Sequence, residues 1–186
     1  MPAVESAMIP LGTVAPDFRL YDPRQNAWRS LDELASPKGT VIVFMCNHCP
    51  YVKHILPALL DCAREYIPKG IAFIGINPND PIAYPDDSPD AMARIARELD
   101  FPFPYLFDET QQVARSYSAT CTPDFFVFDG ERKLVYRGQF DSSRPSNDIP
   151  PTGADLRRAL DALLSGQPLP TDQRPSIGCS IKWRQQ

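Results

Sequence analysis

The strongest structural signal of the chain is Thr40-Val41-Ile42-Val43-Phe44-Met45-Cys46-Asn47-His48-Cys49-Pro50. Its apolar part, Val41 to Met45, lacks the alternation of a strand with one wet face, so it predicts a central strand covered on both sides. The two thiols of Cys46-Asn47-His48-Cys49 follow at the junction between this strand and a predicted helix. Spacing and context favour reversible thiol–disulfide chemistry, although a metal clip uses the same spacing.

Strand and helix signals alternate along the rest of the chain. Turn residues around Phe18 and Leu20 predict a short N-terminal hairpin, and Ser30 caps a predicted helical turn that ends at Leu34. The pattern after the cysteines predicts helices at 51–66, 89–99 and 109–117, and strands at 71–76, 103–107, 125–128 and 134–136. A last helix is predicted between Thr152, its N-terminal cap, and Gly166, where it stops. This order predicts an α/β fold with a central mixed β-sheet flanked by helices.

Length and composition limit the function. With 186 residues, we expect a single domain, 1–186, in which 167–186 form a C-terminal extension packed on the domain or trailing from it. The net charge is −4 and no basic cluster marks a nucleic-acid partner. The apolar runs are too short for a membrane span, and residues 1–10 lack a secretory pattern. We therefore expect a cytoplasmic protein that binds neither nucleic acid nor membrane.

The two cysteines of the motif are expected to play different roles. Cys46 falls at the strand-to-helix junction, where free N–H groups and the helix dipole stabilise a thiolate. Cys49 lies within the first helical turn, where it is more shielded and suited to attack a mixed disulfide. His48 adds a positive charge when it is protonated, which lowers the pKa of the nucleophile and makes the disulfide a stronger oxidant. The structural alternative is a pair of buried, inert cysteines.

Thr122-Pro123 is a second signal, directly before the strand at 125–128. Proline cannot donate to a sheet ladder, so Pro123 must open the strand or lie at a bend. A proline at this position does not by itself establish a cis bond.

Together, these segments resemble the thioredoxin superfamily, specifically its redoxin branch, the alkyl hydroperoxide reductase/thiol-specific antioxidant proteins. The resemblance rests on Ala15 to Leu20, Thr40 to Pro50 and Cys121 to Gly138, and segments such as RPSIGCSIKW resemble a peroxiredoxin-like subgroup with a Cys-x-x-Cys site. It covers nearly the whole chain and implies a thioredoxin-like fold. It also implies that Cys46 attacks and Cys49 resolves, while Thr122 and a cis Pro123 bind an extended substrate.

The chain departs from both well-known relatives. Thr40 stands where thioredoxin buries an aspartate, and Met45 stands where thioredoxin has tryptophan. Peroxiredoxins place Thr-x-x-Cys-Pro at this motif, which makes Cys49 the peroxide-reacting thiol in an alternative interpretation. They also use an arginine near the position of Pro123. Losing the threonine hydroxyl and the arginine removes two groups that orient peroxide, so efficient peroxidase activity is the weaker hypothesis.

Metal binding is the alternative from another class. Cys46, Cys49 and Cys121, with His48, offer soft ligands for copper(I) or zinc. Cys121 is a possible third redox thiol, with simple core packing as the favoured alternative. We expect Cys62 to be core and Cys179 to be packing, with a disulfide as the minority option for Cys179. The aspartates of the loop before the helix at 89–99 are expected to be solvated; they are Asp80, Asp86, Asp87 and Asp90.

The preferred hypothesis is a thiol–disulfide oxidoreductase that uses the dithiol of Cys46 and Cys49. Without a Gly-rich dinucleotide motif, we expect no cofactor and no resident metal, so an external thiol must supply electrons. The partners are then a protein or small-molecule disulfide or dithiol and a thiol reductant. The sequence leaves open the substrate, the direction of electron flow, any role of Cys121 or Cys179, and the oligomeric state.

Overall fold

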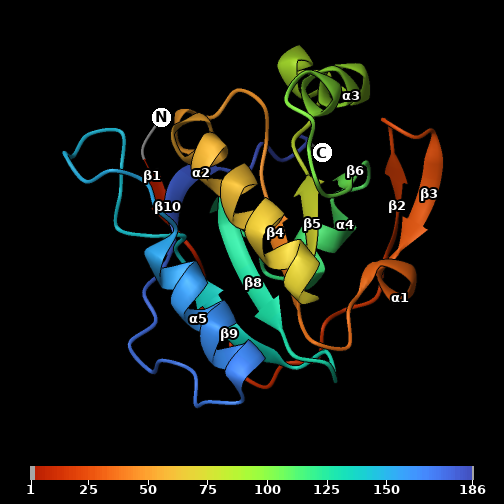
Figure 1. The fold of residues 1–186 in the computed structure, drawn as a ribbon. Helices are drawn as coiled ribbons and strands as arrows, with labels where there is room; N and C mark the ends of the chain where they lie inside the picture. Colours follow the sequence, from red (N-terminus) through yellow and green to blue (C-terminus); the bar gives the residue numbers. More distant parts are fainter. Residues whose placement is uncertain (1–2, 186) are drawn as a thin grey trace.

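A seven-stranded mixed sheet forms the centre of the molecule (Figure 1). The computed structural model describes residues 3–185. The strand order is β3-β2-β6-β5-β4-β8-β9. The strands are β2 (Arg19–Asp22), β3 (Ala27–Ser30), β4 (Thr40–Phe44), β5 (Ala72–Asn77), β6 (Tyr105–Phe107), β8 (Asp124–Phe128) and β9 (Leu134–Gly138). This arrangement confirms the predicted α/β fold with a mixed sheet.

Strand β4 lies in the middle of this sheet, parallel to β5 and antiparallel to β8. All five of its residues are buried. Val41 and Val43 belong to the apolar cluster on one face, whereas Ile42 and Phe44 belong to the cluster on the other. Side chains alternate between the faces of a strand, so an uninterrupted apolar run fits a strand covered on both sides.

Helices cover both faces of the sheet. The helices α2 (Pro50–Tyr66), α3 (Pro89–Glu98) and α5 (Ala154–Ser165) contribute to the first cluster, and Figure 1 shows α2 and α5 in front of the sheet. The short helices α1 (Leu31–Leu34) and α4 (Gln112–Ser116) contribute to the second cluster. Two 3-10 turns, η1 (Ile67–Lys69) and η2 (Pro85–Asp87), complete the helical elements. Within residues 3–185, none of the helices is long and apolar enough to cross a membrane.

The predicted caps are confirmed at two helices and wrong at the third. The side chains of Ser30 and Ser88 accept hydrogen bonds from the first turns of α1 and α3. At α5 the N-cap is Gly153, with φ +77°, and Thr152 lies outside the helix. The Oδ2 atom of Asp141 accepts hydrogen bonds from the amides of Thr152 and Gly153, each at 2.7 Å, and so holds the residues that lead into the helix. The amide of Leu156, the third helical residue, donates to the carbonyl oxygen of Phe140 at 3.2 Å, so a backbone carbonyl takes the role predicted for the threonine hydroxyl.

The C-terminal extension packs onto the domain as part of a second sheet. Strand β10 (Ile177–Ser180) lies between β1 (Ala3–Glu5) and β7 (Cys121–Thr122), antiparallel to both. The contact with β7 is close, because a Cβ added at Gly178 would lie 2.0 Å from the carbonyl oxygen of Thr122. The end of the chain is therefore anchored next to the residue that precedes Pro123.

Candidate redox site

The fold places the two motif cysteines at the carboxyl end of the central strand. Cys46 follows β4 by two residues, and Cys49 is the N-cap of α2. Pro50 occupies the first helical position, where its missing N–H and fixed φ suit a helix start. Both thiols are free and buried, with exposed fractions of 2% for Cys46 and 0% for Cys49. Any reaction with an external partner therefore requires the surrounding segments to move.

Thr122 contacts both sulfurs of the motif. The Sγ atom of Cys46 lies 3.4 Å from Oγ1 of Thr122, and the Sγ atom of Cys49 lies 3.4 Å from its carbonyl oxygen. The Thr122–Pro123 peptide bond is cis. The structure thus brings together Cys46, Cys49 and the Thr-Pro pair, although more than 70 residues separate them in sequence.

The two thiols have opposite pKa shifts. The hydrogen bond from Cys46 lowers the pKa of Cys49 to about 5, with further help from Cys179 and the amide of Val52 and against the effect of burial. The same hydrogen bond, burial and the negative charge of Asp87 raise the pKa of Cys46 well above its usual value. The lowered pKa expected for Cys46 therefore lies on Cys49, because Cys46 retains the shared proton next to a carboxylate.

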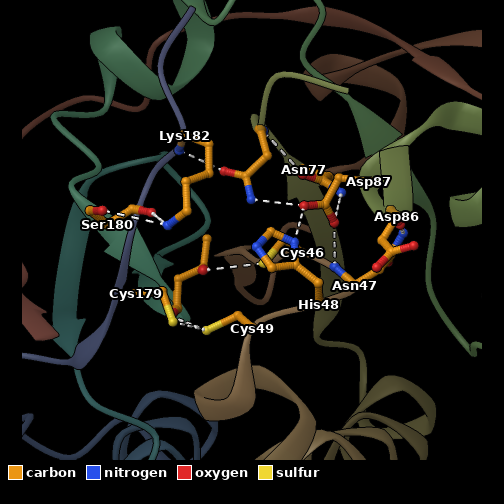
Figure 2. A network of polar contacts seen from close by, with 12 residues as sticks. Cys46, Asn47, His48, Cys49, Asn77, Asp86, Asp87, Cys179, Ser180 and Lys182 are labelled. Atoms are coloured by element: carbon orange, nitrogen blue, oxygen red, sulfur yellow. Dashed lines mark hydrogen bonds and ion pairs between the residues drawn. The ribbon is translucent and has the colours of Figure 1, made fainter. Parts of the chain in front are cut away.

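His48 contacts a buried carboxylate. Its Nδ1 atom pairs with Oδ2 of Asp87 (Figure 2). Its ring stacks on Tyr84 with centroids 5.3 Å apart. Asp87 is 0% exposed, so the expectation that the whole acidic loop is solvated is wrong at this residue. A buried carboxylate needs partners to offset the loss of hydration, and the fold supplies them.

The partners of Asp87 come from two segments, the cysteine motif and the end of β5. Its Oδ1 accepts a hydrogen bond from the amide of Asn47 at 2.6 Å and from Nδ2 of Asn77 at 3.3 Å, and its Oδ2 accepts one from Nδ2 of Asn79 at 3.0 Å. Asn79 in turn accepts a hydrogen bond from the amide of Lys182 at 2.9 Å. Figure 2 shows this network beside the motif. Asp87 was missed as a site residue because nothing in its Pro- and Asp-rich loop distinguishes it from exposed neighbours.

Cys179 enters the site from the C-terminal strand. Its Sγ atom lies 2.8 Å from Sγ of Cys49, and Figure 2 shows the two sulfurs facing each other. In the β10–β7 pairing Cys179 is opposite Thr122. Burial and the hydrogen bond with Cys49 raise the pKa of Cys179 to about 11. The default expectation of simple packing therefore omitted a direct contact with the motif.

The remaining cysteines lie in the core. Cys62 and Cys121 are both 0% exposed, and burial raises the pKa of each, to about 12 for Cys62. The Sγ atom of Cys121 contacts the carbonyl oxygen of Pro123 at 3.7 Å. Both thiols thus remain protonated at neutral pH, which fits the packing interpretation.

A group of metal-ligand type exists, but its members differ from the predicted set. Potential donor atoms of Cys46, His48 and Asp87 lie within 4.8 Å of one another. The predicted set combined Cys46 and His48 with Cys49 and Cys121. In the structure Cys46 and His48 are grouped with Asp87 instead. A thiol, an imidazole and a carboxylate can together bind zinc. The oxygens of Asp87, however, already accept hydrogen bonds from Asn47, Asn77 and Asn79.

Solved structures similar to this one support the fold assignment. An uncharacterized conserved protein from Geobacillus kaustophilus is 55% identical with a TM-score of 0.99, over 100% of this chain and 98% of that one. A hypothetical protein from Sinorhizobium meliloti 1021 is 44% identical with a TM-score of 0.95, over 98% and 99%. The thioredoxin domain of a thiol-disulfide oxidoreductase from Bacteroides vulgatus is 20% identical with a TM-score of 0.58, over 69% and 88%. No curated protein matches the chain significantly.

The central sheet, the helix with Cys49 as its N-cap and the cis Pro123 define a thioredoxin-like protein. The profile of the AhpC/TSA family matches residues 11–137, which is more than half of the chain. The chain therefore belongs to the AhpC/TSA family, and the resemblance to the redoxin branch is confirmed.

Proposed function

We propose that the protein is a thiol–disulfide oxidoreductase in which Cys46 and Cys49 alternate between dithiol and disulfide. The observation that carries the proposal is the placement of both sulfurs against Thr122, each 3.4 Å from one of its oxygens. The opposite pKa shifts of the two thiols fit this arrangement. A dithiol of this kind holds one thiolate and one proton, as thiol exchange requires. Membership of the AhpC/TSA family supports redox chemistry in general.

The pKa shifts favour Cys49 as the attacking thiol and Cys46 as the resolving thiol, which is the reverse of the sequence hypothesis. The Cys49 thiolate attacks a sulfur of the substrate disulfide, which releases one substrate thiolate and leaves a mixed disulfide on Cys49. Cys46 loses its proton and attacks Cys49 Sγ, which releases the second substrate thiolate and closes the Cys46–Cys49 disulfide. An external dithiol returns two electrons to complete the cycle. His48 and Asp87 hold the turn between the cysteines through the contact with Asn47.

The test is a redox titration of metal-free protein in glutathione buffers. We expect a two-electron transition in the wild type and in Cys179→Ser, with the new disulfide inside one tryptic peptide, because Cys46 and Cys49 both lie between Lys38 and Lys53. Cys49→Ser should abolish the transition, while Cys121→Ala should leave it intact. Absence of a transition, together with tight stoichiometric zinc or copper binding, would replace the proposal with the metal-site hypothesis.

The lowered pKa of Cys49 also favours a second function, that of a thiol peroxidase. A thiolate at a helix N-terminus is the nucleophile that attacks peroxide, and Cys49 holds that position. Peroxide consumption should then survive Cys46→Ser and vanish in Cys49→Ser. Rates of reaction with hydrogen peroxide and with glutathione disulfide, measured on the same protein, decide which oxidant is preferred.

A further inference from the structure

We propose that Cys179 is a third redox thiol, which strand β10 delivers to Cys49 and which forms a disulfide with Cys49 in competition with Cys46. The inference rests on the proposed redox function of Cys49 and extends it to the C-terminal segment. It concerns a residue for which the sequence favoured packing, with a disulfide as the minority option.

The first support is the distance between the sulfurs. The Sγ atoms of Cys49 and Cys179 are 2.8 Å apart, and a disulfide bond is about 2.05 Å long. The two side chains already point toward each other (Figure 2), so bond formation requires a small side-chain adjustment. The separation of 130 residues in sequence shows that the fold, and not local chain geometry, creates this contact.

The second support is the position of the strand that carries Cys179. Cys179 pairs with Thr122 on one side and with Ala3 on the other, so its backbone is fixed from both edges. The family resemblance implies that an extended substrate pairs with the backbone of Thr122. In this structure strand β10 pairs there instead. Cys179 therefore sits where a substrate sulfur would be presented to the motif. Gly178 allows this approach, since a Cβ there would collide with the Thr122 carbonyl oxygen.

The chemistry is an ordinary thiol–disulfide exchange. When Cys49 carries a mixed disulfide with a substrate thiol, the deprotonated Cys179 sulfur attacks Sγ of Cys49. The Cys49–Cys179 bond forms, the bond to the substrate sulfur breaks, and the electron pair leaves with the substrate thiolate, which takes up a proton from solvent. Over the whole sequence one substrate disulfide is reduced to two thiols, and two protein thiols are oxidised to one disulfide.

The charges around Cys179 suit attack after capture of a substrate. In the reduced protein the hydrogen bond with Cys49 and the charge on Cys49 raise the pKa of Cys179, in addition to burial. Both effects disappear once the Cys49 sulfur is part of a disulfide. The positive charge of Lys182 lowers the pKa of Cys179 throughout, whereas the negative charge of Asp87 acts against ionisation of Cys46. Cys179 can therefore compete with Cys46 as the second thiol.

The test uses glutathione disulfide and the variant Cys46→Ser, with Cys46→Ser/Cys179→Ser as the matched control. We expect Cys46→Ser to release two glutathione thiols per chain and to form a Cys49–Cys179 disulfide. A tryptic digest detects this bond as two linked peptides, because Lys53 and later basic residues separate the two cysteines. The control should stop at a glutathione adduct on Cys49. Cys46→Ala provides a second background if the serine variant is unstable.

A stable glutathione adduct in Cys46→Ser itself, with Cys179 still open to alkylation, overturns the inference. That result leaves the proposed function intact if Cys179→Ser still forms the Cys46–Cys49 disulfide. The opposite outcome is also distinguishable. If Cys179→Ser loses the Cys46–Cys49 transition while Cys46→Ser forms the Cys49–Cys179 bond, the inference stands and the proposed pairing of Cys46 with Cys49 is rejected. Gly178→Val in the Cys46→Ser background should shift β10 and retain the adduct, while thermal unfolding confirms that the domain is folded.

Discussion

The Sγ atom of Cys49 lies 2.8 Å from the Sγ atom of Cys179, so the N-cap of α2 and the C-terminal strand meet at one sulfur pair. The contact makes the C-terminal segment part of the site and not an appendage to it. It also means that two thiols act on Cys49, since hydrogen bonding with Cys46 and with Cys179 lowers its pKa. The low pKa of Cys49 is thus a property of three cysteines and not of a two-cysteine motif.

Removing the Cys46 thiol should raise the pKa of Cys49. The hydrogen bond from Cys46 is the largest effect that lowers the pKa of Cys49 to about 5, so Cys46→Ala removes it. Cys46→Ser retains a hydroxyl donor and should produce a smaller rise. The measurement is the rate of iodoacetamide alkylation of Cys49 against pH, read by mass spectrometry of the tryptic peptide.

Cys121→Ala is the control for this titration, because the pKa of Cys121 is raised by burial and its thiol stays protonated over the same pH range. If Cys46→Ala and the wild type gave the same alkylation midpoint, the thiol–thiol hydrogen bond would not be what stabilises the thiolate.

The stability of the reduced protein should depend on pH through Cys49. Its pKa is about 5 in the folded chain and roughly 8.5 for a free thiol in an unfolded chain. The unfolded chain therefore binds more protons between these values, and the contribution of Cys49 grows as pH rises from about 5 toward 8.5. The free energy of unfolding of the wild type, minus that of Cys49→Ser, should increase across this range in urea titrations under reducing conditions.

Cys62→Ala serves as the comparison for the pH series. Burial raises the pKa of Cys62 to about 12, so its thiol is protonated in both folded and unfolded chains at pH 5 to 7. Its destabilisation should be constant over that interval. A constant difference for Cys49→Ser as well would contradict the lowered pKa of Cys49.

Neutralising Asp87 should lower the pKa of Cys46 and weaken the fold. The charge of Asp87 opposes ionisation of Cys46, and the carboxylate accepts hydrogen bonds from Asn47, Asn77 and Asn79. Asp87→Asn retains the shape but presents an amide to those donors, at an expected loss of about 1–3 kcal/mol in unfolding free energy. Alkylation of Cys46 against pH in a Cys49→Ser background reports the pKa change.

Asp86→Asn provides the matched control, since Asp86 is the exposed neighbour of Asp87 in η2. It should change stability by less than about 0.5 kcal/mol and leave the alkylation profile of Cys46 where it is. Equal effects of the two substitutions would mean that the buried network does not control Cys46.

Most of the fold could be predicted because its signals are local. The uninterrupted apolar run of β4 needs cover on both faces, and Ser88 followed by Pro89 marks a helix start by its own side-chain chemistry. The motif cysteines and Thr122-Pro123 were also identifiable, because each lies at a recognisable junction of elements. The cysteines and Thr122-Pro123 lie close together because β4, which precedes the cysteines, pairs with β8, which follows Pro123.

The rest of the site depends on contacts between distant segments. Asp87 can be buried because Asn47, Asn77 and Asn79 donate hydrogen bonds to its carboxylate. No local sequence pattern predicts that these residues meet. Cys179 reaches Cys49 because β10 inserts between β1 and β7, and a four-residue strand in a proline-rich tail carries little periodicity. The low pKa lies on Cys49 and not on Cys46 chiefly because of the hydrogen bond between the two thiols, and the missed residues Cys179 and Asp87 add to the difference.

The two predicted caps at Ser88 and Thr152 test whether a helix start is stabilised by its own cap side chain or by a residue from elsewhere in the chain. Ser88 Oγ accepts a hydrogen bond from the amide of Ala91 at 3.2 Å, so Ser88→Ala should cost about 1 kcal/mol of unfolding free energy. Thr152 is exposed and precedes the true cap, and the carbonyl oxygen of Phe140 already accepts the hydrogen bond from the amide of Leu156 in the first turn. Thr152→Ala should therefore change stability by less than about 0.5 kcal/mol. Urea titrations of both variants measure this contrast. A Thr152→Ala loss as large as that of Ser88→Ala would give the capping role to the threonine and reject its assignment to the carbonyl of Phe140.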